Sequence, residues 1–189
     1  MAARRATGAG PMARVFVSST YIDLSDCRVK VRDTLRRMGH EDVAMEYFVA
    51  EDERPVDKCL SAVRASDVYL GIFAFRYGYE PPGHEKSITH LEYEAASEEG
   101  KNCIILLLKD NAPWPVARVD NPRDKIDSMR QQLKERHTVG LFSGEADIEA
   151  RVTEALHNWE REQREEPEIG DASAQLIPPP LHQLPPPPA

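Results

Sequence analysis

Short apolar runs alternate with longer amphipathic stretches along most of the chain, and this alternation constrains the fold more than any other feature. Five runs have the length and composition of strands, at residues 14–18, 42–47, 67–75, 103–108 and 138–142. The stretches between them carry apolar residues at helical spacing or polar connecting sequence. Strands joined by helices imply right-handed crossovers and a mainly parallel sheet. The pattern therefore predicts an α/β fold with five strands and helices on both faces.

The expected helices are marked by apolar stripes and by residues that start or stop a helix. They cover residues 24–38, a segment from Pro55 through Val63, and residues 87–99, 124–136 and 145–163. Gly39 and Gly100 are placed to close the first and third of these helices. The run at 103–108 is the most apolar in the chain, so we expect it at the centre of the sheet.

The composition of the chain predicts one folded domain between two segments of different character. Residues 1–12 contain Arg4 and Arg5 without a following apolar core, so they are interpreted as a disordered leader rather than a secretory signal. Residues 13–164 form the predicted α/β domain. Residues 165–189 are first acidic and then rich in proline, which favours a tail or linker over a ligand for a proline-binding domain.

Charge and cysteine content exclude several classes of function. The formal net charge of −8 argues against a nucleic-acid partner, and no apolar run reaches the ~18 residues of a membrane span. The three cysteines, at positions 27, 59 and 103, are dispersed and predict reduced thiols in a cytoplasmic protein. The histidines are scattered, so no metal site is expected. The glycine-rich motifs of dinucleotide and ATP binding are absent from the sequence.

In a parallel sheet the ligand site lies beyond the carboxyl ends of the strands. Ser18, Ser19 and Asp23 follow the first strand and can either cap the next helix or meet a ligand. Arg76 and Tyr77 follow the third strand. They can hold an anionic or stacked ligand, or Arg76 can pair with a surface carboxylate instead.

The segment that opens the third helix contains the most specific candidate, Glu92. Ser87 or Thr89 is placed to cap this helix, and Ala96 leaves room beside Glu92 one turn later. A carboxylate in the first turn is also stabilised by the helix dipole, so a purely structural role is the alternative. We expect His90 at the surface rather than as a base.

Four motifs occur in a fixed order: VFVSSTYID at 15–23, SDVYLGI at 66–72, RYG at 76–78 and SITHLEYEA at 87–95. Over residues 14–108 they resemble the TIR-like domain of formally unknown function found at the N-terminus of STAND, NACHT and WD-repeat signalling NTPases. The resemblance implies a flavodoxin-like sheet related to TIR domains and, more distantly, to nucleoside deoxyribosyltransferases. It also implies a signalling or effector role of the innate or anti-phage type.

The same resemblance suggests roles for individual residues. Glu92 matches a glutamate that acts at the ribose of NAD or a nucleoside, and is the predicted catalytic residue. The predicted substrate-binding residues are Ser18, Ser19, Asp23, Arg76, Tyr77, Ser87 and Thr89. The resemblance places Phe48, Glu53 and Arg54 in a loop that governs self-association and access to the site.

Two functions follow from the sequence. The first is an NAD nucleosidase, with NAD as a substrate and with no cofactor. The alternative is a non-catalytic module that associates with like domains and acts as an adaptor for an NTPase module in cis or in trans. A third, weaker hypothesis is nucleotide sensing without turnover.

Overall fold

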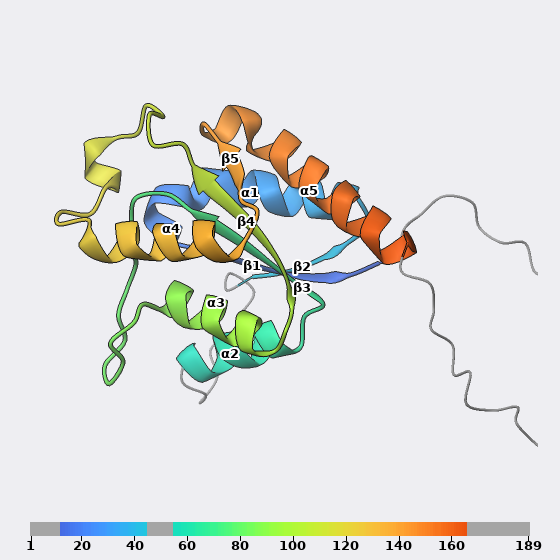
Figure 1. The fold of residues 1–189 in the computed structure, drawn as a ribbon, viewed down its shortest axis with the longest axis horizontal. Coiled ribbons are helices and arrows are strands. Elements are labelled where there is room, and N and C mark those ends of the chain that lie inside the picture. Colours follow the sequence, from blue (N-terminus) through green and yellow to red (C-terminus); the bar gives the residue numbers. More distant parts are fainter. Residues whose placement is uncertain (1–11, 45–54, 166–189) are drawn as a thin grey trace, which may run out of the picture.

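The computed structural model describes residues 12–44 and 55–165, which form one sheet with helices packed on both faces (Figure 1). The elements in chain order are β1 (Arg14–Ser19), α1 (Tyr21–Arg37), β2 (Glu41–Val43), α2 (Pro55–Arg64), β3 (Val68–Phe73), α3 (Ile88–Glu98), β4 (Asn102–Leu108), the 3-10 turn η2 (Val116–Arg118), α4 (Asp124–Arg136), β5 (Gly140–Phe142) and α5 (Glu145–Glu165). Apart from Met12 and Glu165, the predicted leader and tail lie outside the described residues.

All five strands are parallel, in the order β2-β1-β3-β4-β5. This is the strand order of flavodoxin-like folds, so the predicted fold class is confirmed. The middle strand is β3, whose six residues are all buried. The prediction that residues 103–108 form the central strand is therefore wrong, although β4 lies inside the sheet between β3 and β5. A continuous apolar run indicates burial on both faces and does not fix a strand's place in the order.

Two predicted elements differ from the structure by three residues or more at one end, and the other bounds agree to within two residues. Helix α1 begins at Tyr21, three residues before the predicted start. Thr20 is the extended N-cap residue, the first two helical residues, Tyr21 and Ile22, are exposed, and the third, Asp23, is buried but polar, so the apolar stripe begins only at Leu24. Strand β2 ends at Val43, whereas the prediction extended to residue 47. The last three residues of that prediction lie outside the described residues. Gly39 and Gly100 have φ values of +84° and +64°, which confirms that each follows a helix end.

Two apolar clusters cover the two faces of the sheet. One contains the buried stripes of α1 and α5, including Leu24, Val31 and Leu156, and the inward residues Val15 and Val17 of β1. The other packs α2, α3 and α4 against the side chains that alternate with these. Because successive residues of a strand point to opposite faces, neighbouring residues at a strand end contact different helices. This alternation separates Ser18 from Ser19.

The carboxyl ends of β3 and β4 are joined by a buried arginine of α4. Arg130 is 3% exposed, and its guanidinium donates hydrogen bonds to the backbone oxygens of Phe73, Ala74 and Leu108. It also forms an ion pair with Asp110 at 2.8 Å. This cation therefore satisfies carbonyl groups that the two strands leave open at their ends.

Candidate active site at the ends of the first and third strands

Strands β1 and β3 are neighbours whose following helices cover opposite faces of the sheet, α1 on one and α3 on the other. The strand order reverses at this point, and in open α/β sheets the ligand crevice lies there. Ser18 pairs in register with Gly71 of β3, near the carboxyl ends of both strands. Ser18, a predicted site residue, therefore lies at this reversal point.

Ser18 and Glu92 are in direct contact. The Ser18 hydroxyl donates a hydrogen bond to Glu92 Oε2 at 2.6 Å, across 74 residues of sequence. Both side chains are buried, with 1% of Ser18 and 2% of Glu92 exposed. Ser87 caps α3 by accepting a hydrogen bond from the backbone N–H of His90, which fixes the start of the helix and so the position of Glu92 on it.

The rest of the Glu92 environment comes from α2 and β3. Oε1 of Glu92 has no conventional hydrogen-bond partner among the described residues, and the Cys59 thiol acts on the carboxyl as a weak donor. The phenol of Tyr69 in β3 is also close enough to be affected by the Glu92 charge. Burial raises the pKa of the Glu92 carboxyl to about 7, against the lowering effects of Ser18, Arg28 and Cys59. A carboxyl with this pKa exists in both protonation states near neutral pH.

Ser19 faces the opposite side of the sheet and contacts Arg28 of α1. The guanidinium Nη1 of Arg28 donates to Ser19 Oγ at 2.8 Å and to the backbone oxygen of Val17 at 3.4 Å. Arg28 is 3% exposed, so the guanidinium is almost completely buried. The end of β1 therefore holds an arginine on one face and a glutamate on the other.

Arg28, Cys59 and Tyr69 were not among the residues predicted for the site. Arg28 carried a usable signal, because it lies four residues after Leu24 and three before Val31, on the buried stripe of α1. A charged residue at such a position must find a partner inside the protein. Cys59 and Tyr69 gave no comparable signal, since a thiol and a phenol are ordinary in an apolar core.

Asp23 forms a second buried acidic group in the first turn of α1. It is 1% exposed, and neither carboxylate oxygen has a hydrogen-bond partner among the described residues. Burial raises the pKa of Asp23, while Thr20 and the nearby Arg76 act to lower it. Arg76 also lies 3.8 Å from Asp120, which accepts a hydrogen bond from the backbone N–H of Tyr77. The charge of Arg76 is thus close enough to Asp23 to act on its carboxyl.

Gly78 brings the remaining predicted residues together. Its φ of +94° is one that glycine adopts freely, and a Cβ there would lie 3.0 Å from Thr20 Cγ2 and 3.7 Å from Thr89 Oγ1. Ser87 lies at a similar distance, so the loop after β3 packs between the first strand end and the start of α3. These hydroxyl-bearing residues border one small region at the sheet edge.

The prediction for His90 is wrong, and the prediction of an interaction loop is not tested. His90 was expected at the surface, but its side chain is only 12% exposed and its Nδ1 lies 2.8 Å from the Tyr77 hydroxyl. The expectation failed because the loop after β3 folds back over α3 and covers the ring. The proposed interaction loop, with Phe48, Glu53 and Arg54, lies outside the described residues, so its role stays a prediction.

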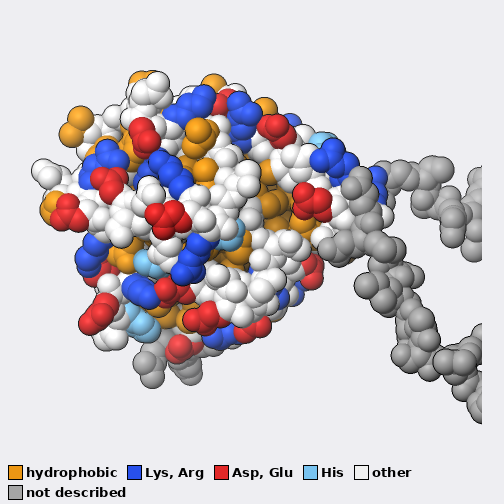
Figure 2. Space-filling view, in the orientation of Figure 1, with side chains coloured by type: hydrophobic (Ala, Val, Ile, Leu, Met, Phe, Trp, Pro, Cys, Tyr) orange, Lys and Arg blue, Asp and Glu red, His pale blue; other side chains and the backbone are white. Residues whose placement is uncertain are grey.

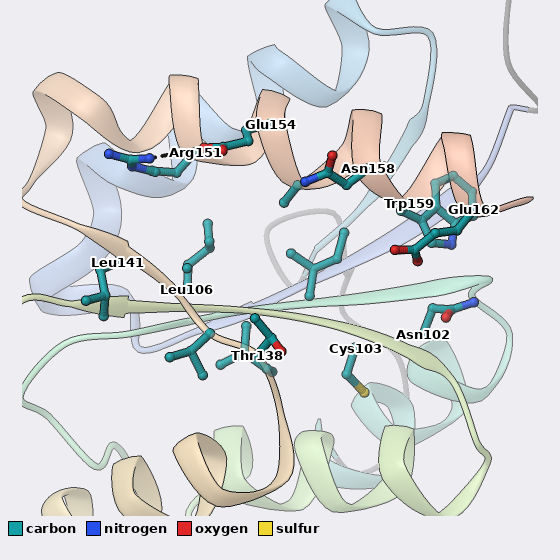
Figure 3. A pocket seen from close by; sticks show the side chains of 15 residues that line it. Asn102, Cys103, Leu106, Thr138, Leu141, Arg151, Glu154, Asn158, Trp159 and Glu162 are labelled. Atoms are coloured by element: carbon teal, nitrogen blue, oxygen red, sulfur yellow. Dashed lines mark hydrogen bonds and ion pairs between the residues drawn. The ribbon is translucent and has the colours of Figure 1, made fainter.

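The cavity in Figure 3 is separate from this cluster. It has a volume of about 480 Å³ and lies between β4 and α5, bordered by Asn102, Thr138 and Trp159. None of the predicted site residues lines it. Within the described ranges, no cluster of three or more His, Cys, Asp or Glu side chains is arranged to hold a metal ion.

The surface in Figure 2 carries interspersed positive and negative side chains with apolar groups between them. No single sign of charge dominates this face of the molecule. Among residues 12–44 and 55–165, no helix combines the length and apolar character needed to cross a bilayer.

Comparison with known proteins gives one family and several distant likenesses. The chain is 28% identical over 86 residues to "Telomerase protein component 1" of Rattus norvegicus, which corresponds to 38% of this chain and 3% of that protein. Two solved structures match the chain at low similarity. One is the flavodiiron core of Flv1 from Synechocystis, with 10% sequence identity and a TM-score of 0.43 over 80% of this chain and 35% of that chain. The other is an oxidoreductase from Corynebacterium diphtheriae, with 14% identity and a TM-score of 0.40 over 79% of this chain and 96% of that chain.

The match to a family model extends over residues 14–157, well beyond the region 14–108 that carries the four motifs. It includes every predicted catalytic and substrate-binding residue and nearly the whole described fold. The chain therefore belongs to the family described as a domain of unknown function, DUF4062.

Proposed function

We propose that this domain cleaves the N-glycosidic bond between nicotinamide and ribose in NAD, with Glu92 as the catalytic carboxylate. The observation that carries the proposal is the buried Glu92 carboxyl, which accepts a hydrogen bond from Ser18 at the point where the strand order reverses. The resemblance to TIR-like domains supports the same assignment, because a glutamate at this position acts at the ribose in catalytic relatives.

The position of Glu92 is costly for a residue with only a structural role. Moving a carboxyl into an apolar interior disfavours its charged form, and an apolar side chain would pack there without that cost. Buried acids with perturbed pKa values are concentrated at functional sites for this reason. The same physics distinguishes Glu92 from Glu94, which lies two residues later and forms a more exposed ion pair with Lys86.

In the proposed reaction the bond between C1′ of the ribose and the nicotinamide nitrogen breaks, and its electron pair goes to the nicotinamide ring. The ionised Glu92 carboxylate opposes the positive charge that develops on the ribose, or forms a transient ester with C1′. A water molecule then supplies the hydroxyl at C1′, and its proton can pass to Glu92. A carboxyl whose pKa is about 7 can accept and release a proton at neutral pH.

The other predicted residues supply binding groups around this centre. Ser19 borders the same strand end and is proposed to orient the ribose or phosphates. Arg76 keeps more than a quarter of its side chain exposed beside Asp120, and is proposed to hold the pyrophosphate. Its guanidinium geometry suits two phosphate oxygens at once.

Glu92 is enclosed in the described structure, so substrate contact requires an opening. Cys59 of α2 is one of the groups that enclose it, and α2 packs against α3. We propose that association of like domains favours the open arrangement. Activity is then expected mainly in clustered protein.

The test is NAD consumption by protein displayed at high density on beads, compared with the same protein in dilute solution. Glu92→Gln is the critical variant, and Glu98→Gln is its matched control, because Glu98 lies on the exposed face of the same helix. Cleavage by wild type and Glu98→Gln, with loss in Glu92→Gln, supports the proposal. Equal turnover by Glu92→Gln contradicts the role of Glu92, and no turnover under clustering contradicts the enzyme.

A non-catalytic adaptor is the second candidate, favoured by exposed apolar side chains on α1. Tyr21, Ile22 and Val29 are 64%, 68% and 56% exposed. Self-association through this surface predicts that Ile22→Asp lowers the mass measured by light scattering at high concentration. An unchanged mass, monomeric in both proteins, counts against this candidate.

A further inference from the structure

Strand β4 has an open edge that neither the proposed reaction nor the family match explains. On one side it pairs with β3 along residues 102–107, whereas on the other side β5 pairs only with residues 106–108. Residues 102–105 therefore have no strand partner on that side within the part of the chain that the structure describes. In a parallel sheet, alternate residues of a strand direct their N–H and C=O groups to the same neighbour. The amino half of β4 thus presents backbone donors and acceptors that no strand pairs.

The cavity in Figure 3 lies along this open edge. Its volume is about 480 Å³, and it extends from β4 to Trp159 of α5. The first residue of β4 is exposed and the next two are half-buried, whereas the last four are buried. Open strand edges bind extended segments, which add a strand to the sheet through main-chain hydrogen bonds. The cavity therefore has the form of a groove for such a segment.

A buried donor without a partner borders the same groove. Trp159 is 8% exposed, and its indole N–H has no hydrogen-bond partner among residues 12–44 and 55–165. Buried polar groups in native proteins are almost always hydrogen-bonded, so this exception requires an explanation. A segment in the groove brings carbonyl groups that can accept this bond.

The chain leaves its last described helix at the rim of the groove. Glu162, near the end of α5, borders the cavity together with Asn102 at the start of β4. Glu160 lies 3.3 Å from His40, the residue before β2, so this end of α5 lies at the amino ends of the strands. Residues 166–189 continue from here. A segment that enters the groove from this point runs parallel to β4.

We propose that residues 171–177 bind in this groove as a further parallel strand beside residues 102–105 of β4. This segment, with the sequence DASAQLI, contains no proline, so each of its residues can donate a backbone hydrogen bond. Its Leu176 and Ile177 are apolar, as befits a strand between two layers of helices. Residues 166–170 link it to α5 and span at most about 17 Å when extended.

A folded partner fits this groove less well than a free segment does. The open edge is flanked by α5 and by residues 138–139, which lead into β5, so the sheet edge of a second folded copy meets these before it reaches β4 (Figure 3). The chain's own segment is also held near the groove at an effective concentration on the order of millimolar. The binding is independent of the proposed reaction, because no predicted site residue borders the groove.

The direct test is hydrogen exchange of individual backbone amides, measured by NMR on the full chain. Ala174→Pro and Gln175→Pro are the critical variants, because they are neighbours and one of them must remove an N–H that points to β4. Gln183→Pro is the matched control, since it lies in the same tail outside the segment.

In the wild type we expect alternate amides of residues 171–177 and of residues 102–105 to exchange at least about tenfold more slowly than unpaired amides. At least one critical variant is expected to abolish this protection in both segments, and Gln183→Pro to retain it. Wild-type amides of residues 171–177 that all exchange at unpaired rates overturn the proposal. Protection of residues 102–105 that survives both critical variants also overturns it.

Dilution identifies the source of the segment. Binding of the chain's own segment predicts protection that is unchanged on dilution on the order of a hundredfold, together with a monomeric mass by light scattering. Protection that is lost on dilution, with a dimeric mass at high concentration, shows that the groove takes the segment of a second copy and overturns binding within one chain. NAD cleavage enters neither measurement, so failure of the proposed enzyme and failure of this inference are distinguishable.

Discussion

Replacing Glu92 with glutamine removes an ionisable group from the interior and keeps the size of the side chain and an oxygen that Ser18 can bond. Burial raises the pKa of Glu92 from the ordinary glutamate value of 4.5 to about 7 in the folded protein. Between those two pH values the folded state binds the Glu92 proton more strongly than the unfolded state does. The contribution of the Glu92 carboxyl to the free energy of unfolding is therefore fully present below pH 4.5 and is lost as the pH rises through 7.

The size of this effect follows from the shift. About 2.5 pH units at about 1.4 kcal/mol each give a loss of about 3 kcal/mol between pH 4.5 and pH 8. The assay is urea unfolding of wild type and Glu92→Gln at pH 5, 6, 7 and 8. The difference between the two proteins isolates Glu92, because every other group titrates in both.

We expect wild type to lose up to about 3 kcal/mol relative to Glu92→Gln across this range. Glu98→Gln controls for the loss of one negative charge from the same helix. A difference between wild type and Glu92→Gln that stays constant from pH 5 to pH 8 refutes the assignment of a perturbed, buried carboxyl.

Three further substitutions test the contacts that hold the site and the sheet. Ser18→Ala removes the hydroxyl that donates to Glu92, so it is expected to lower the free energy of unfolding by about 1–3 kcal/mol at pH 8 and by less at pH 5, as measured with urea. Arg130→Met strips the bonds to three strand-end carbonyls and is expected to lower that free energy by about 3 kcal/mol, which a urea midpoint will show. In Gly71→Ala the new Cβ would lie 2.6 Å and 2.8 Å from the two buried aromatic rings beside it on β3, so a loss of about 1–3 kcal/mol is expected in the same assay.

Local patterns were sufficient to predict most of the fold. The apolar runs located every strand, and glycines marked two helix ends, because burial and helix termination depend on neighbouring residues. The position of β4 in the sheet was not predictable in this way, because it depends on which strands pair. The start of α1 was missed because its first two residues are exposed and its third, Asp23, is polar, so the buried apolar stripe begins only at Leu24.

The candidate site was predictable only in part. Ser18 and Glu92 were each predicted as site residues, yet their contact depends on the register of β1 against β3. The enclosure of Glu92 depends on the packing of α2, to which Cys59 belongs, and no local pattern reports it. Arg28 was overlooked although a charge on an apolar stripe is visible in the sequence.

The central claim is that Glu92 acts on the ribose of NAD, and one comparison tests it most directly. Clustered wild-type protein and clustered Glu92→Gln are incubated with NAD, and free nicotinamide is measured over time. The proposed mechanism predicts nicotinamide release by the wild type and at least about a hundredfold less by Glu92→Gln, as expected when a catalytic carboxylate is lost. Release at equal rates by the two proteins, or no release by either, contradicts the claim.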